Sequence, residues 1–203
     1  MDSKQDLYNQ LDELVTKYPN KNFAFIGEIG AGKSTCAEYL DAKYGFKQLS
    51  YASNVKRFAK MILGRDINKG IDRPLLQQIG QYLKLPSWSL NNEQNRAIRN
   101  WLTSDDFRKE YDRLVFANKM HKPTLYINLL KECIGNFKYT IQDMRFLIEA
   151  ESEKECDTII VLIKTYKAKE RVIERDGTYN DNWNKDSSEQ EWSKIKHDCV
   201  IWN

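Results

Sequence analysis

Residues 22–37 read NFAFIGEIGAGKSTCA, and this stretch decides the fold of the chain. Its first five residues are mostly apolar and favour a strand, and the residues from Thr35 onward favour a helix. Between them, Gly27 to Ser34 match the pattern G-x-x-x-x-G-K-[ST]. A strand, this pattern and a helix in that order are typical of a phosphate-binding loop, or P-loop.

The chemistry of a P-loop follows from its residue types. Glycines let backbone N–H groups close around a polyphosphate, and the following helix adds the partial positive charge of its N-terminus. Lys33 is expected to reach the β- and γ-phosphates of a nucleoside triphosphate, and the Ser34 hydroxyl to bind Mg²⁺. The alternative is a chance match or a loop that no longer binds nucleotide. The strand and helix patterns on either side disfavour that alternative.

Length and composition fit one soluble domain. The 203 residues carry 32 basic and 29 acidic side chains, a net charge of +3, which indicates no surface for a polyanion. The four cysteines are scattered and match no zinc or disulfide pattern, which fits a reducing cytosol. No apolar run is long enough to span a membrane, and the N-terminus lacks the features of a signal peptide. We therefore expect a cytoplasmic protein without a membrane partner or a stable nucleic-acid partner.

Segments with strand patterns alternate with segments that have helical patterns. An amphipathic helix is expected over residues 3–18, and the strands are predicted at 22–26, 46–51, 137–142, 157–163 and 198–203. This alternation favours a parallel sheet with helical crossovers. The sequence therefore predicts an α/β fold: a doubly wound, five-stranded parallel sheet of the P-loop kinase type. Its ligand should lie outside the C-terminal ends of the strands.

Two segments interrupt the alternation within an expected single domain of residues 1–203. Residues 64–123 lack strand patterns and predict a helical insertion. Residues 166–188 combine a basic helix with a polar loop and predict a short lid. A further helix is expected over residues 54–63, with Ser53 as its N-cap.

One predicted strand ends in a carboxylate. A bound nucleoside triphosphate needs an acid near its metal, and in this fold class the acid usually stands at the end of a neighbouring strand. Asp143 follows the strand at 137–142, so we expect it to face the metal or the substrate. Alternatively it is a helix N-cap, and the two roles are compatible. Arg145 would face the same cleft and grip a phosphate, or instead form a surface ion pair.

Other cations are candidates for binding phosphate. Arg171 and Arg175 lie four residues apart on one face of the lid helix. That face is either an arm that closes over the transferring phosphates or a solvated face paired with glutamates. Arg73 stands at the start of a predicted helix, where the helix dipole disfavours a cation, which suggests a task such as holding an anion. Lys56 offers a further cation.

Four blocks of sequence stand out together. They are the P-loop, DRPLLQQIG at 72–80, IQDMRF at 141–146 with Glu149, and Ser188-Glu189 followed by DCVIWN at 198–203. In this order they resemble the deoxynucleoside monophosphate kinases of bacteriophages, within the nucleoside monophosphate kinase group of P-loop enzymes. The blocks span nearly the whole chain after the first helix. Many families share the first block, whereas the second and third are much more specific.

The resemblance implies transfer of the γ-phosphate of ATP to a deoxynucleoside 5′-monophosphate (dNMP) with Mg²⁺, giving ADP and the diphosphate (dNDP). It implies that Ser34 and Asp143 bind the metal. The ATP-binding residues would be Gly27, Glu28, Ile29, Gly30, Ala31, Gly32, Lys33, Ser34 and Thr35. The acceptor-binding residues would be Lys56, Arg73, Asp143 and Arg145. The catalytic residues would be Lys33, Asp143, Arg145, Arg171 and Arg175.

Two alternatives to this function stay open. The first is a kinase for another small phosphate acceptor or for a nucleic-acid 5′ end, although the nearly balanced charge argues mildly against a nucleic-acid groove. The second is a nucleotide-binding regulatory module without efficient transfer, in which the arginines would not converge on the P-loop. The sequence leaves open which bases are accepted and whether a homodimer forms. For a protein of phage origin, the expected location is the host cytoplasm.

Overall fold

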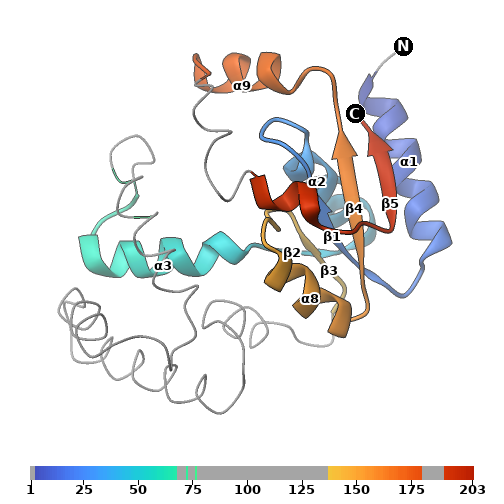
Figure 1. Cartoon of the computed structure of the whole chain (residues 1–203), viewed down its shortest axis with the longest axis horizontal. Helices are drawn as coiled ribbons and strands as arrows, with labels where there is room; N and C mark the ends of the chain where they lie inside the picture. The colour runs from blue at the N-terminus through green and yellow to red at the C-terminus, as the bar shows by residue number, and fades with distance from the viewer. Residues whose placement is uncertain (1–2, 68–71, 73–75, 77–136, 180–189) are drawn as a thin grey trace. The chain divides into compact units, whose positions relative to one another are not determined.

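The computed structural model describes residues 3–67, 72, 76, 137–179 and 190–203 (Figure 1). The chain divides into two compact units, one made of Met1–Ser50 with Asn136–Asn203 and the other of Tyr51–Gly135. The first unit contains the P-loop and every described strand. The second unit includes residues 64–123, the predicted insertion, most of which lies outside the described residues.

The first unit is built on a five-stranded parallel sheet. Its strands are β1 Asn22–Ile26, β2 Lys47–Leu49, β3 Tyr139–Ile141, β4 Thr158–Lys164 and β5 Cys199–Trp202. Their order across the sheet is β2-β3-β1-β4-β5, and each neighbouring pair is parallel. The chain therefore winds first to one side of β1 and then to the other. This confirms the predicted α/β fold with a doubly wound parallel sheet.

Helices of the first unit flank this sheet. They are α1 Ser3–Lys17, α2 Lys33–Tyr44, α8 Leu147–Glu155, α9 Ala168–Asp176 and the short 3-10 helix η2 Trp192–Lys194. Glycine ends two of them. Gly45 closes α2 with φ 73° and Gly177 closes α9 with φ 75°. This left-handed conformation strains other residues but not glycine, so these two glycines fix where the helices stop.

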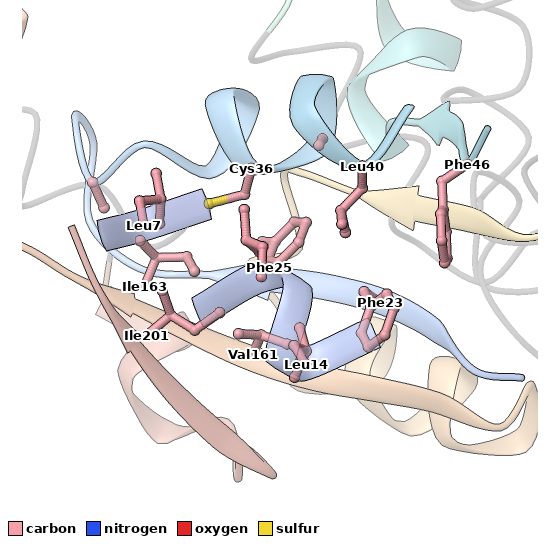
Figure 2. Packing of buried hydrophobic residues seen from close by; sticks show 13 residues of the cluster. Leu7, Leu14, Phe23, Phe25, Cys36, Leu40, Phe46, Val161, Ile163 and Ile201 are labelled. Carbon is pink, nitrogen blue, oxygen red and sulfur yellow. The ribbon is translucent and has the colours of Figure 1, made fainter. Parts of the chain in front are cut away.

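One face of the sheet is covered by α1 and α2. Apolar side chains from alternate positions of β1, β4 and β5 meet side chains of the two helices in one buried cluster (Figure 2). Its members are Leu7, Leu11, Leu14, Phe23, Phe25, Ala31, Cys36, Ala37, Leu40, Phe46, Val161, Ile163 and Ile201. The cluster fixes α2 on the sheet, and with it the P-loop that immediately precedes α2.

A carboxylate on α1 also holds α2. Asp12 accepts hydrogen bonds from the hydroxyls of Tyr39 at 2.7 Å and Tyr44 at 2.8 Å, and from the ammonium of Lys43 at 2.6 Å. Tyr8 of α1 stacks on Tyr39, with ring centroids 4.1 Å apart. The N-terminal helix is thus a packing element, as its apolar stripe predicts.

The opposite face of the sheet carries α8. The hydroxyl of Tyr139 donates a hydrogen bond to Glu153 at 2.8 Å, and the hydroxyl of Thr158 donates to the same oxygen at 2.9 Å. All three side chains are buried. Burial, together with the charge of Glu153, raises the pKa of Tyr139 well above its usual range. These bonds fasten α8 to the amino ends of β3 and β4, at the far end of the sheet from the P-loop.

The predicted boundaries fail after the second strand. The strand predicted over 46–51 is only Lys47–Leu49, and helix α3, Tyr51–Leu63, begins three residues before the predicted start. Ser53 lies inside this helix, so its prediction as an N-cap is wrong. Tyr51 is 3% exposed, and burying its ring outweighs the local preference for serine at a helix start. The end of the predicted lid, residues 180–188, lies outside the described residues.

Candidate functional site

The P-loop joins β1 to α2, as the sequence predicts. β1 ends at Ile26 and α2 begins at Lys33. The ammonium of Lys33 donates hydrogen bonds to the backbone oxygens of Gly27 at 2.6 Å and Glu28 at 2.8 Å. The loop therefore curves around its own lysine. A cation and a helix N-terminus come together here, and these are the two features that bind a polyphosphate.

Gly30 and Gly32 of the loop have no room for a side chain. Gly30 has φ 87°, and a Cβ placed on it would lie 2.3 Å from the backbone oxygen of Ala168. Gly32 has φ 99°, and its Cβ would lie 2.0 Å from Nδ2 of Asn203. The first contact comes from the start of α9 and the second from the residue after β5. The loop backbone thus lies directly against these two C-terminal segments, which only glycine permits.

Replacing Gly30 with alanine is expected to destabilise the protein by more than about 2 kcal/mol, because strained backbone adds to the clash with Ala168. Gly45→Ala is the matched control. Gly45 has a similar φ of 73° but nothing within 4 Å of the added Cβ, so only the backbone cost of about 1 kcal/mol applies. Urea unfolding of both variants measures the difference. If both variants lose the same free energy of unfolding, the close contact between the loop and α9 is contradicted.

The first turn of α2 offers a hydroxyl for a metal. Ser34 is exposed, and Thr35 beside it is half-buried. A serine hydroxyl, a lysine and glycine backbone amides form the set of groups that holds the Mg²⁺ complex of a nucleoside triphosphate. The residues present therefore fit ATP with Mg²⁺.

Glu28 has a perturbed carboxyl group within the loop. Its partial burial raises the pKa above the usual value, and the positive charge of Lys33 offsets only part of this effect. The folded-state pKa therefore lies above the unfolded value. The favourable contribution of the protonated group is fully present below the unfolded pKa and is lost as the pH rises through the folded pKa. Ionised Glu28 thus costs stability at neutral pH.

Glu28→Gln is expected to raise the free energy of unfolding at neutral pH and to leave it unchanged in acid. Urea titrations from about pH 4 to about pH 8 would measure both effects. Glu38→Gln, the same substitution at an exposed position of α2, is the matched control. A Glu28→Gln protein with the same pH dependence as the unchanged protein would contradict the raised pKa.

Asp143 lies at the same edge of the sheet as the P-loop. It follows β3 by two residues, and β3 pairs in parallel with β1, which leads into the loop. The carboxylate accepts a hydrogen bond of 2.7 Å from the hydroxyl of Ser50. Ser50 directly follows β2, so two neighbouring strand ends are linked beside the loop. Sequence reasoning misses Ser50 because it extends the second strand through Tyr51.

Glu149 fixes the segment that carries Arg145. One carboxylate oxygen of Glu149 accepts hydrogen bonds from the backbone N–H of Arg145 at 2.6 Å and of Phe146 at 2.9 Å. Glu149 is 2% exposed and stands in the first turn of α8, where a carboxylate also interacts favourably with the helix dipole. The pattern D-x-R-F-x-x-E therefore has a structural basis: its last residue holds the backbone between Asp143 and α8.

The two arginines of α9 have different surroundings. Nη2 of Arg171 donates a hydrogen bond of 3.0 Å to Oδ1 of Asn203. The guanidinium of Arg175 is bound by the carboxylate of the adjacent Asp176, through bonds of 2.7 and 2.6 Å. Asn203 in turn contacts the P-loop, so the structure brings Arg171 to the loop. The contacts of Arg175 are within its own helix.

The remaining acceptor-side candidates belong to the second unit. Lys56 is exposed on α3, and Arg73 lies outside the described residues. Asp72, which precedes Arg73, is 5% exposed and binds the guanidinium of Arg65 through bonds of 2.8 and 2.7 Å. The backbone oxygen of Asp72 accepts a bond of 3.0 Å from the N–H of Leu76. The first residue of the DRPLLQQIG block is thus anchored within its own unit.

The described residues form neither a clustered metal site nor a membrane-spanning helix. No group of three or more His, Cys, Asp or Glu side chains among them is arranged to hold a metal ion. None of the helices that the structure describes is both long and apolar enough to cross a bilayer.

Comparison with known proteins gives limited similarity. No protein-family model matches the sequence. Over 73 residues the chain is 27% identical to uncharacterized protein ORF76 of Ictalurid herpesvirus 1 (strain Auburn); the match covers 36% of this chain and 30% of the viral protein's length. Among solved structures, TT1252 from Thermus thermophilus is 17% identical and has a TM-score of 0.44, covering 90% of this chain and 88% of that one.

The chain's own sheet order and loop define its fold. A parallel five-stranded sheet, with the P-loop between the central strand and the following helix, is a P-loop-like α/β fold. The edge of the sheet beyond β1 and β3 gathers the P-loop, Asp143 and Ser50, and Arg171 joins them through Asn203.

Proposed function

We propose that this protein is a deoxynucleoside monophosphate kinase, which transfers the γ-phosphate of ATP to a dNMP and gives ADP and a dNDP. One observation carries the proposal: the Asp143 carboxylate, which accepts a hydrogen bond from Ser50, lies just beyond the end of β3, the strand that pairs with the P-loop strand β1. A loop alone is enough to hold a nucleotide. A strand-end acid beside the loop supports phosphoryl transfer, which needs a metal and an acceptor placed near the phosphates.

The protein's part in this reaction would be positioning and charge neutralisation. Lys33 and the loop amides would hold the phosphates of ATP, and Arg171 would stand close to them. Mg²⁺, when bound by Ser34 and Asp143, would neutralise phosphate charge. Arg145, on the segment held by Glu149, would grip the acceptor phosphate with two donors.

The choice of a dNMP as acceptor rests on the resemblance of the blocks at 72–80 and 141–146. Another small phosphate acceptor, or a nucleic-acid 5′ end, is the runner-up within the same chemistry. We further propose that the enzyme works in the cytoplasm on small-molecule substrates. For a protein of phage origin, this would be the cytoplasm of the host cell. A homodimer is a secondary proposal that light scattering would test.

A second candidate function comes from another class. The protein would be a nucleotide-binding regulatory module without efficient transfer. The observation that favours it is the pairing of Arg175 with Asp176 on α9, since this arginine was expected to act on the transferring phosphates. Only measured turnover separates this candidate from the kinase, because both bind ATP.

A coupled ADP-release assay tests the proposal. Purified protein with Mg²⁺ and ATP is given each of the four dNMPs in turn, and ADP release above the rate without acceptor is expected for at least one. A Lys33→Met protein prepared in parallel controls for contaminating kinases. Absence of turnover with every dNMP, in a protein that binds ATP, would reject the kinase and favour the regulatory module.

A further inference from the structure

The side chain of Asn203 joins α9 to the P-loop. Its Nδ2 donates a hydrogen bond of 2.8 Å to the backbone oxygen of Ala31, and its Oδ1 accepts one of 3.0 Å from Arg171. The backbone N–H of Asn203 donates to Lys164 at 2.8 Å and so continues the pairing of β5 with β4. Asn203 is therefore held at both its backbone and its side chain.

The chemistry of the two partners fixes which way the carboxamide points. The oxygen of Ala31 can only accept a hydrogen bond, so it must face the amide nitrogen. Arg171 can only donate, so it must face the amide oxygen. Among the ordinary side chains of this size, only asparagine supplies a donor and an acceptor side by side. Aspartate has the same shape but lacks the donor.

Arg171 is held where a cation is normally disfavoured. Its Nη1 lies 3.7 Å from the position of a Cβ on Gly32, the residue that precedes α2. The charges of Lys33 and Arg171 both act to lower the pKa of Cys36 on α2, although burial outweighs them and raises it to about 12. Two cations thus approach the first turn of α2, against the helix dipole. An anion at the loop would stabilise both.

We propose that Asn203 is a positioning residue for ATP. It holds the Arg171 guanidinium beside the P-loop before nucleotide arrives, so that the triphosphate meets a pre-placed second cation next to Lys33. Pre-placement spares the entropy of ordering a long side chain on binding. This inference rests on the ATP-binding half of the proposed function and does not depend on the acceptor.

Calorimetric titration with MgATP, without any acceptor, tests the role of Asn203. Asn203→Ala is expected to weaken MgATP binding about tenfold, the effect of one charge-assisted hydrogen bond. Asn203→Asp should weaken it at least as much, because the carboxylate keeps Arg171 but neutralises its charge and cannot donate to Ala31. In an Arg171→Ala background, Asn203→Ala should change binding by less than about twofold, since the group it positions is gone.

Val200→Ala, three residues earlier at a partly exposed position of β5, is the control for loosening the strand and should not change MgATP binding. A merely structural Asn203 would weaken binding by the same factor with or without Arg171, and that result would overturn the inference. Unchanged binding in Asn203→Ala or Asn203→Asp would overturn it as well. MgATP binding with the expected coupling, but without turnover on any dNMP, would reject only the kinase proposal.

Discussion

Exchanging Lys33 for methionine is expected to lower kcat/KM for ATP by on the order of 10²- to 10³-fold, the usual effect of removing a preorganised group that stabilises transition-state charge. Lys33 is the cation that the loop surrounds, through its bonds to the backbone oxygens of Gly27 and Glu28. Methionine keeps the length of the side chain and removes the charge. Binding of MgATP should weaken together with turnover, since ground-state phosphates also meet this ammonium.

The control for Lys33→Met is Lys47→Met, which removes an exposed cation from β2, at a distance along the chain from the loop. Its MgATP affinity should equal that of the unchanged protein. Circular dichroism checks that both variants fold. Lys33→Arg should recover little activity, because the planar guanidinium is larger and cannot occupy the same place between the two oxygens. Full MgATP affinity in Lys33→Met would refute the assignment of the loop as the phosphate site.

Local patterns were enough to predict the P-loop and the strands around it. The apolar run before Gly27 and the helical pattern after Lys33 depend on residues that are neighbours in sequence. The described strands lie within three residues of their predicted bounds for the same reason. The order of the strands across the sheet could not be predicted from such local patterns. It depends on which strands pair, such as β1 with β3 and β4, and no local pattern encodes that pairing.

The site could be predicted only in part, because several of its contacts join distant residues. Ser50 meets Asp143 across 93 positions, and Asn203 meets Ala31 across 172. Neither serine nor asparagine carries a charge that marks it as functional in sequence. Asp143 was recognisable because it is the one carboxylate that directly follows a predicted strand. Its partner was hidden by the early start of α3 at Tyr51, which tertiary burial determines.

The different contacts of Arg171 and Arg175 also could not be predicted from the sequence, because they depend on distant residues. Spacing alone made Arg171 and Arg175 equivalent, four residues apart on one helical face. In the structure Asp176 binds Arg175, while Asn203 holds Arg171 beside the loop. The difference between them depends on β5, which reaches the loop only through the folding of the sheet. We therefore expect Arg171→Ala to affect ATP binding more than Arg175→Ala does.

Asp143→Asn is expected to reduce kcat for phosphoryl transfer by on the order of 10²- to 10³-fold while leaving MgATP binding within a few-fold of normal. The amide has the shape of the carboxylate and can still accept the hydrogen bond from Ser50, so the strand ends stay linked. What is lost is the negative charge beside the metal and the acceptor. That charge matters most when the γ-phosphate is transferred, and less when ATP is merely held by the loop.

Two further variants sharpen the test of Asp143. Ser50→Ala removes the bond that orients the carboxylate but keeps its charge, so kcat should fall only about five- to tenfold, the cost of one hydrogen bond. Glu38→Gln removes an exposed carboxylate from α2 and should leave kcat unchanged. Single-turnover rates over a Mg²⁺ titration measure all three. The N-cap of α8 is Phe146, so the alternative prediction that Asp143 caps this helix is wrong. If Asp143→Asn transfers phosphate at the normal rate, Asp143 has no chemical role, and the strand-end acid must be sought elsewhere. If Ser50→Ala loses as much as Asp143→Asn, the hydroxyl itself acts on the substrate, and the carboxylate serves to orient it.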